Sequence, residues 1–292
     1  MVVKNSASAI PKFPDLKTPD QLKKFLCSKG PRHKAFYHYT NRGALKGIIA
    51  SQKLYLSRSD TLNDSLEGNK SKTKNAYIAS FVFREPESLP MWAMYAFPYQ
   101  DGLRLRFKRA AMNQVIRQFN KSPKVYSAEN GLVIPGCGKG ELSVMDVAYA
   151  HDNYLEYNGD KNINNLFFDN VKKSLSKDTI LNWAIKHDAW IAEREVRLIL
   201  KLEKAIPDKK VAIDFSSALK SFEIMCGPCM NVMEIDPIVK KIASISISDY
   251  WNRTYFRSCQ GCQHRTKICR ERNIIGSQTC NSDKKTITIS IV

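Results

Sequence analysis

Glycine and proline are scarce in this sequence, and it contains no long apolar run. With 13 glycines and 12 prolines in 292 residues, collagen-like and low-complexity classes are excluded. No window approaches the roughly 18 uninterrupted apolar residues of a membrane-spanning helix, and the start of the chain lacks the apolar core of a signal peptide. The sequence has no glycine-rich phosphate loop of the Rossmann or P-loop type. We therefore expect a cytoplasmic protein without a membrane segment, and neither a Rossmann dehydrogenase nor a P-loop NTPase.

Acidic residues are few relative to basic ones. The chain has 28 Asp and Glu against 46 Lys and Arg, a net charge of +18. Residues 1–34, 101–124 and 253–292 carry a net charge of +6 each, so these three segments account for the whole excess. Clustered positive charge is typical of proteins that bind nucleic acid or other anionic macromolecules. The alternative is that these lysine-rich segments are solvated surface.

The spacing of apolar residues predicts a mixture of strands and helices. Strand-like runs occur at residues 36–40, 54–56, 77–83, 103–107, 196–200, 211–215, 222–226 and 242–247. Helical patterns occur at residues 45–49, 112–119 and 163–171, and from residue 236. Because helices and strands do not alternate strictly, we predict an α+β fold with a mainly antiparallel or split sheet and flanking helices.

The most specific segment is Tyr37-His38-Tyr39-Thr40, which lies on the first predicted strand. On a strand, His38 and Thr40 share one face, while the two tyrosines point the other way. A histidine and a hydroxyl on one face can hydrogen-bond a sugar diol, and nearby tyrosines can stack on an aromatic ring. The alternative is that His38 is a structural residue with satisfied hydrogen bonds.

Two resemblances follow from this opening. The pattern YH-x-T, then L-x-x-I-I, then L-x-L-S resembles the first strand, helix and second strand of the ADP-ribosyltransferase superfamily, including its DNA-modifying toxins. The opening is also similar to an uncharacterised bacterial family, together with three later segments. These segments are Ala79-Ser80-Phe81, the M-W-x-x-Y run at 91–95 and the E-x-E-x-R run at 193–197.

The superfamily resemblance implies NAD as the substrate and assigns roles to matching positions. His38 would hold the ribose of NAD, and the neighbouring Tyr39 and Thr40 would also belong to the NAD site. The catalytic glutamate would be Glu195 or Glu193. If residues 193–197 form a strand, Glu195 lies on the same face as Arg197, a partner that would keep it ionised. We therefore prefer Glu195, and the alternative is a surface salt bridge.

Other positions of the implied NAD site stay open. Ser57, Ser80 or Tyr95 could supply the middle motif of the superfamily. Trp92 or Tyr95 could form a wall of the nicotinamide pocket, although such a cluster is also typical of core packing. The polar segment 63–68 is expected to be an exposed loop, in which Asp64 and Glu67 could contact substrate.

The eight cysteines cluster toward the C-terminus. Cys226-Gly-Pro-Cys229 has the letters of a thioredoxin motif, but it follows a strand without the helix that such a motif needs, so we expect a turn. A C-terminal group of soft ligands has the residue types that zinc binds and could form a zinc site, with disulfides and free thiols as alternatives. Its members are Cys259, Cys262, His264, Cys269 and Cys280. A single site joining the pairs 226/229 and 259/262 is a further option.

Taken together, these patterns predict three parts. We expect a basic N-terminal arm (1–34) with at most one short helix near residues 20–27, an ADP-ribosyltransferase-like domain (35–250) and a basic, cysteine-rich tail (251–292). The leading hypothesis is an NAD-dependent ADP-ribosyltransferase-like enzyme acting on an anionic or macromolecular target, as a toxin or phage-defence effector. The alternative is a noncatalytic module that binds nucleic acid or nucleotides.

Overall fold

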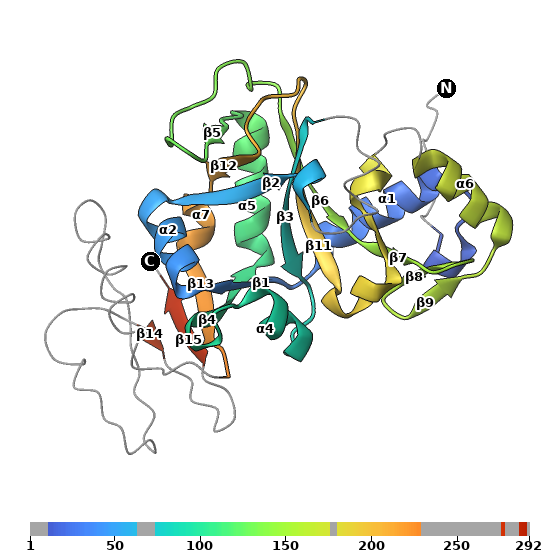
Figure 1. Cartoon of the computed structure of the whole chain (residues 1–292), viewed down its shortest axis with the longest axis horizontal. Helices are drawn as coiled ribbons and strands as arrows, with labels where there is room; N and C mark the ends of the chain where they lie inside the picture. The colour runs from blue at the N-terminus through green and yellow to red at the C-terminus, as the bar shows by residue number, and fades with distance from the viewer. Residues whose placement is uncertain (1–10, 63–73, 176–179, 229–275, 278–285, 291–292) are drawn as a thin grey trace, which may run out of the picture.

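The computed structural model describes residues 11–62, 74–175, 180–228, 276–277 and 286–290 (Figure 1). The α-helices are α1 (Pro19–Lys29), α2 (Arg42–Ser51), α4 (Leu89–Tyr95), α5 (Arg109–Lys121), α6 (Asn165–Leu175) and α7 (Ser216–Leu219). The 3₁₀ helices are η1 (Phe13–Asp15), η2 (Gly30–Arg32), η3 (Ser59–Thr61), η4 (Tyr99–Asp101), η5 (Ile180–Trp183) and η6 (Asp188–Glu193). None of the helices among these residues is both long and apolar enough to span a membrane.

The strands form two sheets. Those of the large sheet are β1 (Ala35–Asn41), β2 (Lys53–Arg58), β3 (Ala76–Val82), β4 (Gly102–Lys108), β5 (Tyr126–Ser127), β6 (Glu141–Asp146), β11 (Glu195–Lys201), β12 (Lys210–Asp214), β13 (Ser221–Cys226), β14 (Gly276–Ser277) and β15 (Thr286–Ser290). Those of the small sheet are β7 (Ala148–Ala150), β8 (Leu155–Tyr157), β9 (Asp160–Asn162) and β10 (Ile185–His187).

The large sheet is antiparallel and the small sheet contains one parallel pair. The order in the large sheet is β14-β15-β13-β4-β1-β3-β2-β12-β5, and β11 pairs with both β3 and β6. In the small sheet, β10 runs parallel to β7. Helices lie against the sheets (Figure 1). The predicted α+β class, with a mainly antiparallel sheet and flanking helices, is confirmed.

The predicted strand, helix and strand at 36–56 are present as β1, α2 and β2. The side chain of Asn41 accepts the backbone N–H of Ala44 at 2.9 Å and so caps the start of α2. Gln52 ends the helix in a left-handed conformation with φ of 53°. The helical face with Leu45 and Ile48 is buried in the main core, which holds α2 against the strands on either side of it.

β1 and β2 both pair with the same edge of β3, but at opposite ends of it. On this edge, Tyr37 of β1 pairs with Val82, and β2 pairs with Tyr77 and Ile78. Residues 79–81 of β3 lie between these pairs. The sheet is therefore split at this point, and the split is bridged by α2.

The N-terminal segment expected as an arm is partly folded. α1 packs with α6 and the small sheet in a second hydrophobic core. His33, just after η2, lies 2.8 Å from the carboxylate of Asp146 on β6, and the hydroxyl of Tyr157 donates to the same carboxylate at 2.6 Å. Asp146 is fully buried, so the contact with His33 ties the N-terminal segment into the body of the protein.

The E-x-E-x-R run at 193–197 does not form one continuous strand, as the sequence had suggested. β11 begins only at Glu195, whereas Glu193 is the last residue of η6. Arg194 between them has a left-handed backbone with φ of 45°, which breaks the strand alternation that the sequence suggested. Both faces of β11 are buried, because Leu198 packs in the main core and Ile199 in the second core. The predicted helix from residue 236 and strand at 242–247 lie outside the described residues.

Candidate active site

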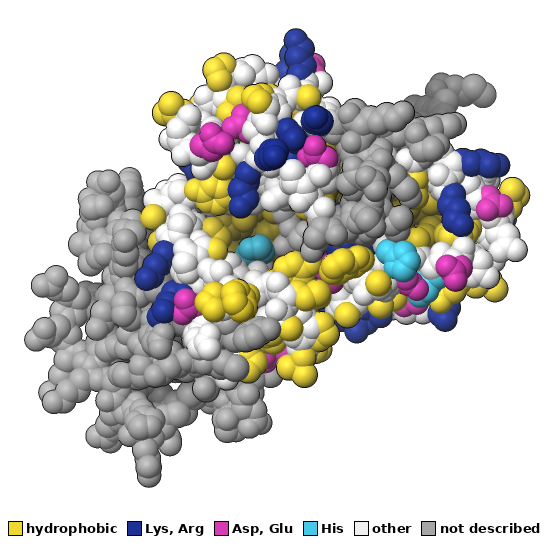
Figure 2. Space-filling model, in the orientation of Figure 1, with side chains coloured by type: hydrophobic (Ala, Val, Ile, Leu, Met, Phe, Trp, Pro, Cys, Tyr) yellow, Lys and Arg dark blue, Asp and Glu magenta, His cyan; other side chains and the backbone are white. Residues whose placement is uncertain are grey.

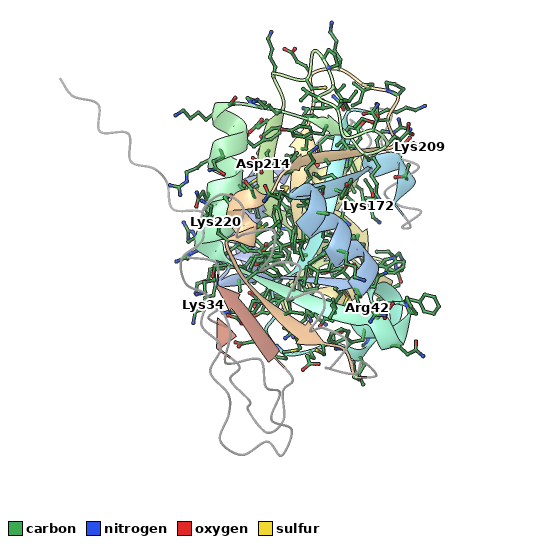
Figure 3. The ribbon with its side chains drawn as sticks, turned by 90° about the vertical axis from the view of Figure 1, so that its left-hand side faces the viewer. Lys34, Arg42, Lys172, Lys209, Asp214 and Lys220 are labelled. Carbon is green, nitrogen blue, oxygen red and sulfur yellow. The ribbon has the colours of Figure 1, made fainter. Side chains whose placement is uncertain are left out.

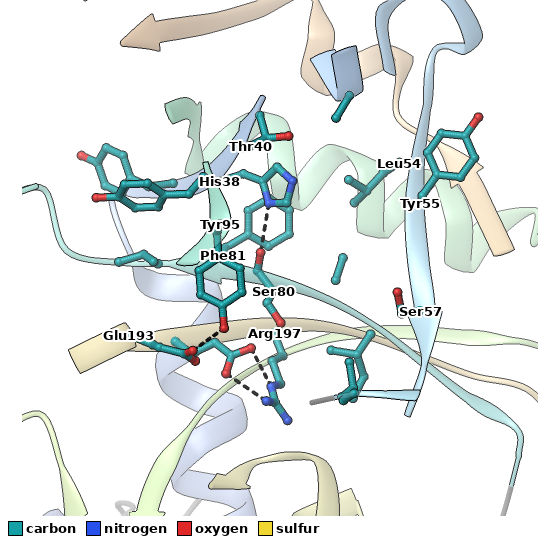
Figure 4. Close-up of a pocket in the computed structure, with 18 of the residues that line it drawn as sticks. His38, Thr40, Leu54, Tyr55, Ser57, Ser80, Phe81, Tyr95, Glu193 and Arg197 are labelled. Atoms are coloured by element: carbon teal, nitrogen blue, oxygen red, sulfur yellow. Dashed lines mark hydrogen bonds and ion pairs between the residues drawn. The ribbon is translucent and has the colours of Figure 1, made fainter. Parts of the chain in front are cut away.

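A cavity of about 640 Å³ lies in the split between β1, β2 and β3 (Figure 4). Apolar side chains from α2, β2 and β3 line part of it, including Ile48, Leu54 and Phe81. Polar side chains reach it from two walls, one on β1 and one on η6 and β11. A hollow with hydrophobic side chains around it is visible on this face of the molecule (Figure 2).

His38 forms the β1 wall. Its Nδ1 lies 3.1 Å from the backbone oxygen of Ser80. Because a carbonyl oxygen only accepts hydrogen bonds, Nδ1 must donate and therefore carries the hydrogen. Burial lowers the pKa of His38, so the ring is neutral near pH 7 and its Nε2 is a hydrogen-bond acceptor. The ring packs 5.4 Å from that of Phe81, centroid to centroid.

Glu195 and Arg197 form the core of the opposite wall. The guanidinium of Arg197 donates to both carboxylate oxygens of Glu195, at 2.8 and 2.9 Å, and its third nitrogen donates to the Trp183 carbonyl at 2.7 Å. Burial alone would raise the pKa of Glu195, but the charges of Arg197 and Lys186 outweigh it and hold that pKa well below its usual range. Glu195 is therefore ionised although only 2% of it is exposed. This excludes the surface salt bridge considered from the sequence.

Glu193 occupies the same wall in a different electrostatic state. Its carboxylate accepts hydrogen bonds from the Tyr95 hydroxyl and, at 2.6 Å, from the ammonium group of Lys186. Burial raises the pKa of Glu193, and the negative charge of Glu195 raises it further. Two neighbouring carboxyl groups with pKa values pushed in opposite directions are typical of sites that move a proton.

Ser80 lies between the two walls. It is the exposed residue of β3, a strand that is otherwise buried. Its carbonyl accepts from His38, and its side chain hydrogen-bonds to Glu195 and helps to lower the pKa of that carboxyl. Of the three residues considered for the middle motif, Ser80 is therefore the one that contacts both His38 and Glu195. Tyr95 donates to Glu193, and Ser57 lines the cavity from β2.

Most of the residues predicted for the site come together, and one does not. Eight of them line the cavity: His38, Tyr39, Thr40, Ser57, Ser80, Tyr95, Glu193 and Glu195. Trp92 lies outside it, because its ring packs edge-on against Tyr39 at 4.9 Å and its indole N–H donates to Glu87 at 3.1 Å. The core-packing interpretation therefore holds for Trp92.

Lys186 is the site residue that the sequence did not suggest. It lies on β10 of the small sheet, 2.6 Å from Glu193 and 3.3 Å from Glu195, and its side chain is 3% exposed. Its ammonium also lies 4.9 Å from the centre of the Trp190 ring. A single lysine in a short strand has no recognisable motif, and only its contacts identify it.

The residues predicted for a metal site and for a substrate-binding loop lie outside the part of the chain that the structure describes. Cys259, Cys262, His264, Cys269 and Cys280 lie outside the described residues, as do Cys229 and the loop with Asp64 and Glu67. In the part of the chain that the structure describes, no group of three potential metal ligands occurs. Cys226 is buried at the end of β13, where the backbone N–H of Gly227 donates to Gly102 at 2.8 Å.

Comparison with known proteins relates part of the chain to an uncharacterised family. Residues 91–198 match the model of a family described as a protein of unknown function (DUF2971). This stretch runs from α4 into β11. It contains Lys186, Glu193, Glu195 and Arg197, which we call the acidic wall of the cavity, but not His38. No curated protein and no solved structure matches the chain. The expected similarity to an uncharacterised family is confirmed over residues 91–198, and the similarity to ADP-ribosyltransferases stays a prediction.

Proposed function

We propose that the cavity binds NAD and transfers its ADP-ribose to a macromolecular acceptor. The observation that carries the proposal is that a neutral histidine and an ionised, buried glutamate line one cavity on either side of Ser80 of β3. The resemblance of β1, α2 and β2 to the opening of the ADP-ribosyltransferase superfamily supports the same activity. The cavity volume of about 640 Å³ lies in the range of small-molecule sites.

In this proposal each wall has a separate task. Nε2 of His38 accepts a hydrogen bond from a ribose hydroxyl and fixes the sugar. The bond between ribose C1′ and the nicotinamide nitrogen then breaks, and its electron pair leaves with neutral nicotinamide. Glu195 stabilises the positive charge that develops on the ribose. The acceptor attacks C1′, and its proton passes to Glu193, whose raised pKa suits a proton acceptor.

One observation favours the noncatalytic alternative, a nucleotide-binding module. Both carboxylate oxygens of Glu195 are already engaged by Arg197, and one of them also lies 3.3 Å from Lys186. A structural role in the ion pair with Arg197 is therefore enough to explain why this carboxylate is buried, without any contact to a substrate. Under this alternative the cavity binds a nucleotide without turnover, with His38 and the cation of Lys210 at the lining as the contacts.

The deciding experiment measures nicotinamide release from NAD by the full chain, in the presence of DNA, RNA or cell lysate, together with the mass gain on the acceptor. Glu195→Gln keeps the shape of the side chain and removes its charge, so we expect release to fall by about 100- to 1,000-fold. Glu141→Gln, on the exposed end of β6, is the matched control and should retain full activity.

The outcomes separate the two functions. Full activity of Glu195→Gln with loss in Glu193→Gln would move the catalytic role to Glu193. Full activity of the double variant would refute the mechanism. Saturable NAD binding without nicotinamide release, and without any acceptor gaining mass, would establish the binding module instead.

A further inference from the structure

A row of basic residues crosses one end of the large sheet. Ala35 at the start of β1 pairs with Lys108 at the end of β4, and Phe107 pairs with Phe222 near the start of β13. Lys34 and Lys220 directly precede β1 and β13. The backbones of Lys34, Lys108 and Lys220 therefore lie close together at the same end of three neighbouring strands, which are about 4.8 Å apart. Figure 3 shows Lys34 and Lys220 on the same side of the molecule, beside α5.

α5 extends this row along its exposed side. Arg109, its first residue, donates a backbone hydrogen bond to Lys34 at 3.1 Å and a guanidinium hydrogen bond to the Arg32 carbonyl at 3.2 Å. The helix is about 20 Å long. We call the whole set the basic face: Arg32, Lys34, Lys108, Arg109, Arg117, Lys121 and Lys220, all of which are exposed.

The charges of the basic face are not neutralised locally. The segments that build it, residues 21–59, 102–128 and 215–222, contain no Asp or Glu. Two other cations of these segments do have acidic partners from outside them, Arg106 with Glu223 and Arg42 with Asp101. Within the described ranges, by contrast, none of the seven basic side chains has an acidic partner. Two of the three basic segments found in the sequence thus meet on one surface.

We propose that the basic face binds the phosphate backbone of double-stranded nucleic acid. A continuous group of exposed cations suits the closely spaced phosphates of a nucleic-acid backbone. Single strands are bound mainly by stacking their bases on exposed aromatic rings. The aromatic residues of β1, β4, β13 and α5 are all buried: Phe36, Tyr37, Tyr39, Phe107, Phe119 and Phe222. The duplex is therefore favoured over a single strand.

The basic face and the cavity lie on different sides of the molecule. Arg42, at the start of the helix that lines the cavity, is on the side opposite Lys34 and Lys220 (Figure 3). A duplex on the basic face therefore tethers the protein and does not enter the cavity. The inference is independent of the proposed NAD chemistry and can fail without affecting it.

The experiment measures the affinity of the full chain for a short duplex DNA by fluorescence anisotropy at several salt concentrations. The test variant changes four exposed lysines of the basic face to glutamine: Lys34, Lys108, Lys121 and Lys220. The control variant removes four exposed lysines from other surfaces: Lys46, Lys201, Lys204 and Lys209. Both variants lose the same net charge, and exposed lysine-to-glutamine changes should leave the thermal midpoint unchanged.

With roughly 0.9 unit of slope in log affinity against log salt per phosphate contact, the test variant should lose about two to three units and the control less than about 0.5. Affinity of the test variant should fall at least tenfold at about 0.1 M salt. Equal losses in both variants would reduce the effect to net charge and overturn the proposal. Tighter binding to single-stranded DNA, or to polyglutamate as a model of an acidic protein, would overturn it as well.

Discussion

Replacement of Lys186 by methionine is expected to destabilise the protein by an amount that depends on pH. The ammonium group of Lys186 lies 2.6 Å from Glu193 and 3.3 Å from Glu195, with its side chain 3% exposed. Methionine fills similar space without charge. Removing one partner of a buried ion pair costs about 3–5 kcal/mol, because the other charge stays buried without compensation.

Glu193 makes this cost sensitive to pH. Its pKa is already raised by burial and by Glu195, and Lys186 is the main group that opposes the rise. Without Lys186 the pKa of Glu193 rises further, and each additional unit costs about 1.4 kcal/mol once the carboxyl has to ionise. The folded variant thus retains a proton that the unfolded chain has released, so its stability falls as pH rises. The penalty relative to wild type should be smallest near pH 5 and largest near pH 8.

Urea unfolding followed by tryptophan fluorescence at these two pH values measures the effect. Lys186→Arg keeps the positive charge and should restore most of the stability at the higher pH. The double variant Lys186→Met/Glu193→Gln removes the titrating group, so its penalty should not increase between pH 5 and pH 8. A penalty for Lys186→Met that does not change with pH, or a double variant that keeps the pH dependence, would refute the reasoning.

Four further predictions concern the stability of the fold. Asp146→Asn should lower the free energy of unfolding by about 3 kcal/mol, as measured in urea, because a fully buried carboxylate that binds a histidine and a tyrosine is lost. Gly30→Ala should cost about 1–3 kcal/mol, since its Cβ would lie 2.7 Å from a valine methyl group. By contrast, Gly47→Ala meets no atom within 4 Å and should gain about 0.5–1 kcal/mol in its helix. Burial lowers the pKa of His38, so stability should decrease as pH falls through about 6.5, and His38→Gln should flatten this dependence in urea titrations.

The β1–α2–β2 unit could be predicted because its determinants are local. Apolar alternation over 36–40 fixes which side chains face inward, Asn41 caps the helix, and the buried face repeats at helical spacing. Glu195 and Arg197 were also paired correctly, since residues two apart on a strand share a face. In each case the relevant neighbours are a few residues away in the sequence.

The rest of the acidic wall depends on contacts that a sequence pattern does not encode. Lys186 is followed by a histidine and an aspartate, and such a polar stretch is typical of a surface. It is buried because β10 pairs with β7 and thereby turns against η6. Glu193 joins it only through the left-handed backbone of Arg194. Trp92 shows the opposite case: the sequence suggested it for the site because it is close to Tyr95 along the chain, but it packs outside the cavity.

The residues that form the acidic wall also hold the two sheets together, and this decides how any loss of activity should be interpreted. The backbone N–H of Glu195 donates to the Tyr149 hydroxyl of the small sheet at 3.0 Å, while its side chain anchors Arg197. A neutral substitute for Glu195 leaves the Arg197 guanidinium buried without its charged partner, which costs stability whether or not the carboxylate has a chemical role. Activity therefore has to be compared at equal folded fraction. Only a loss of turnover that exceeds the loss of folded protein supports a catalytic glutamate.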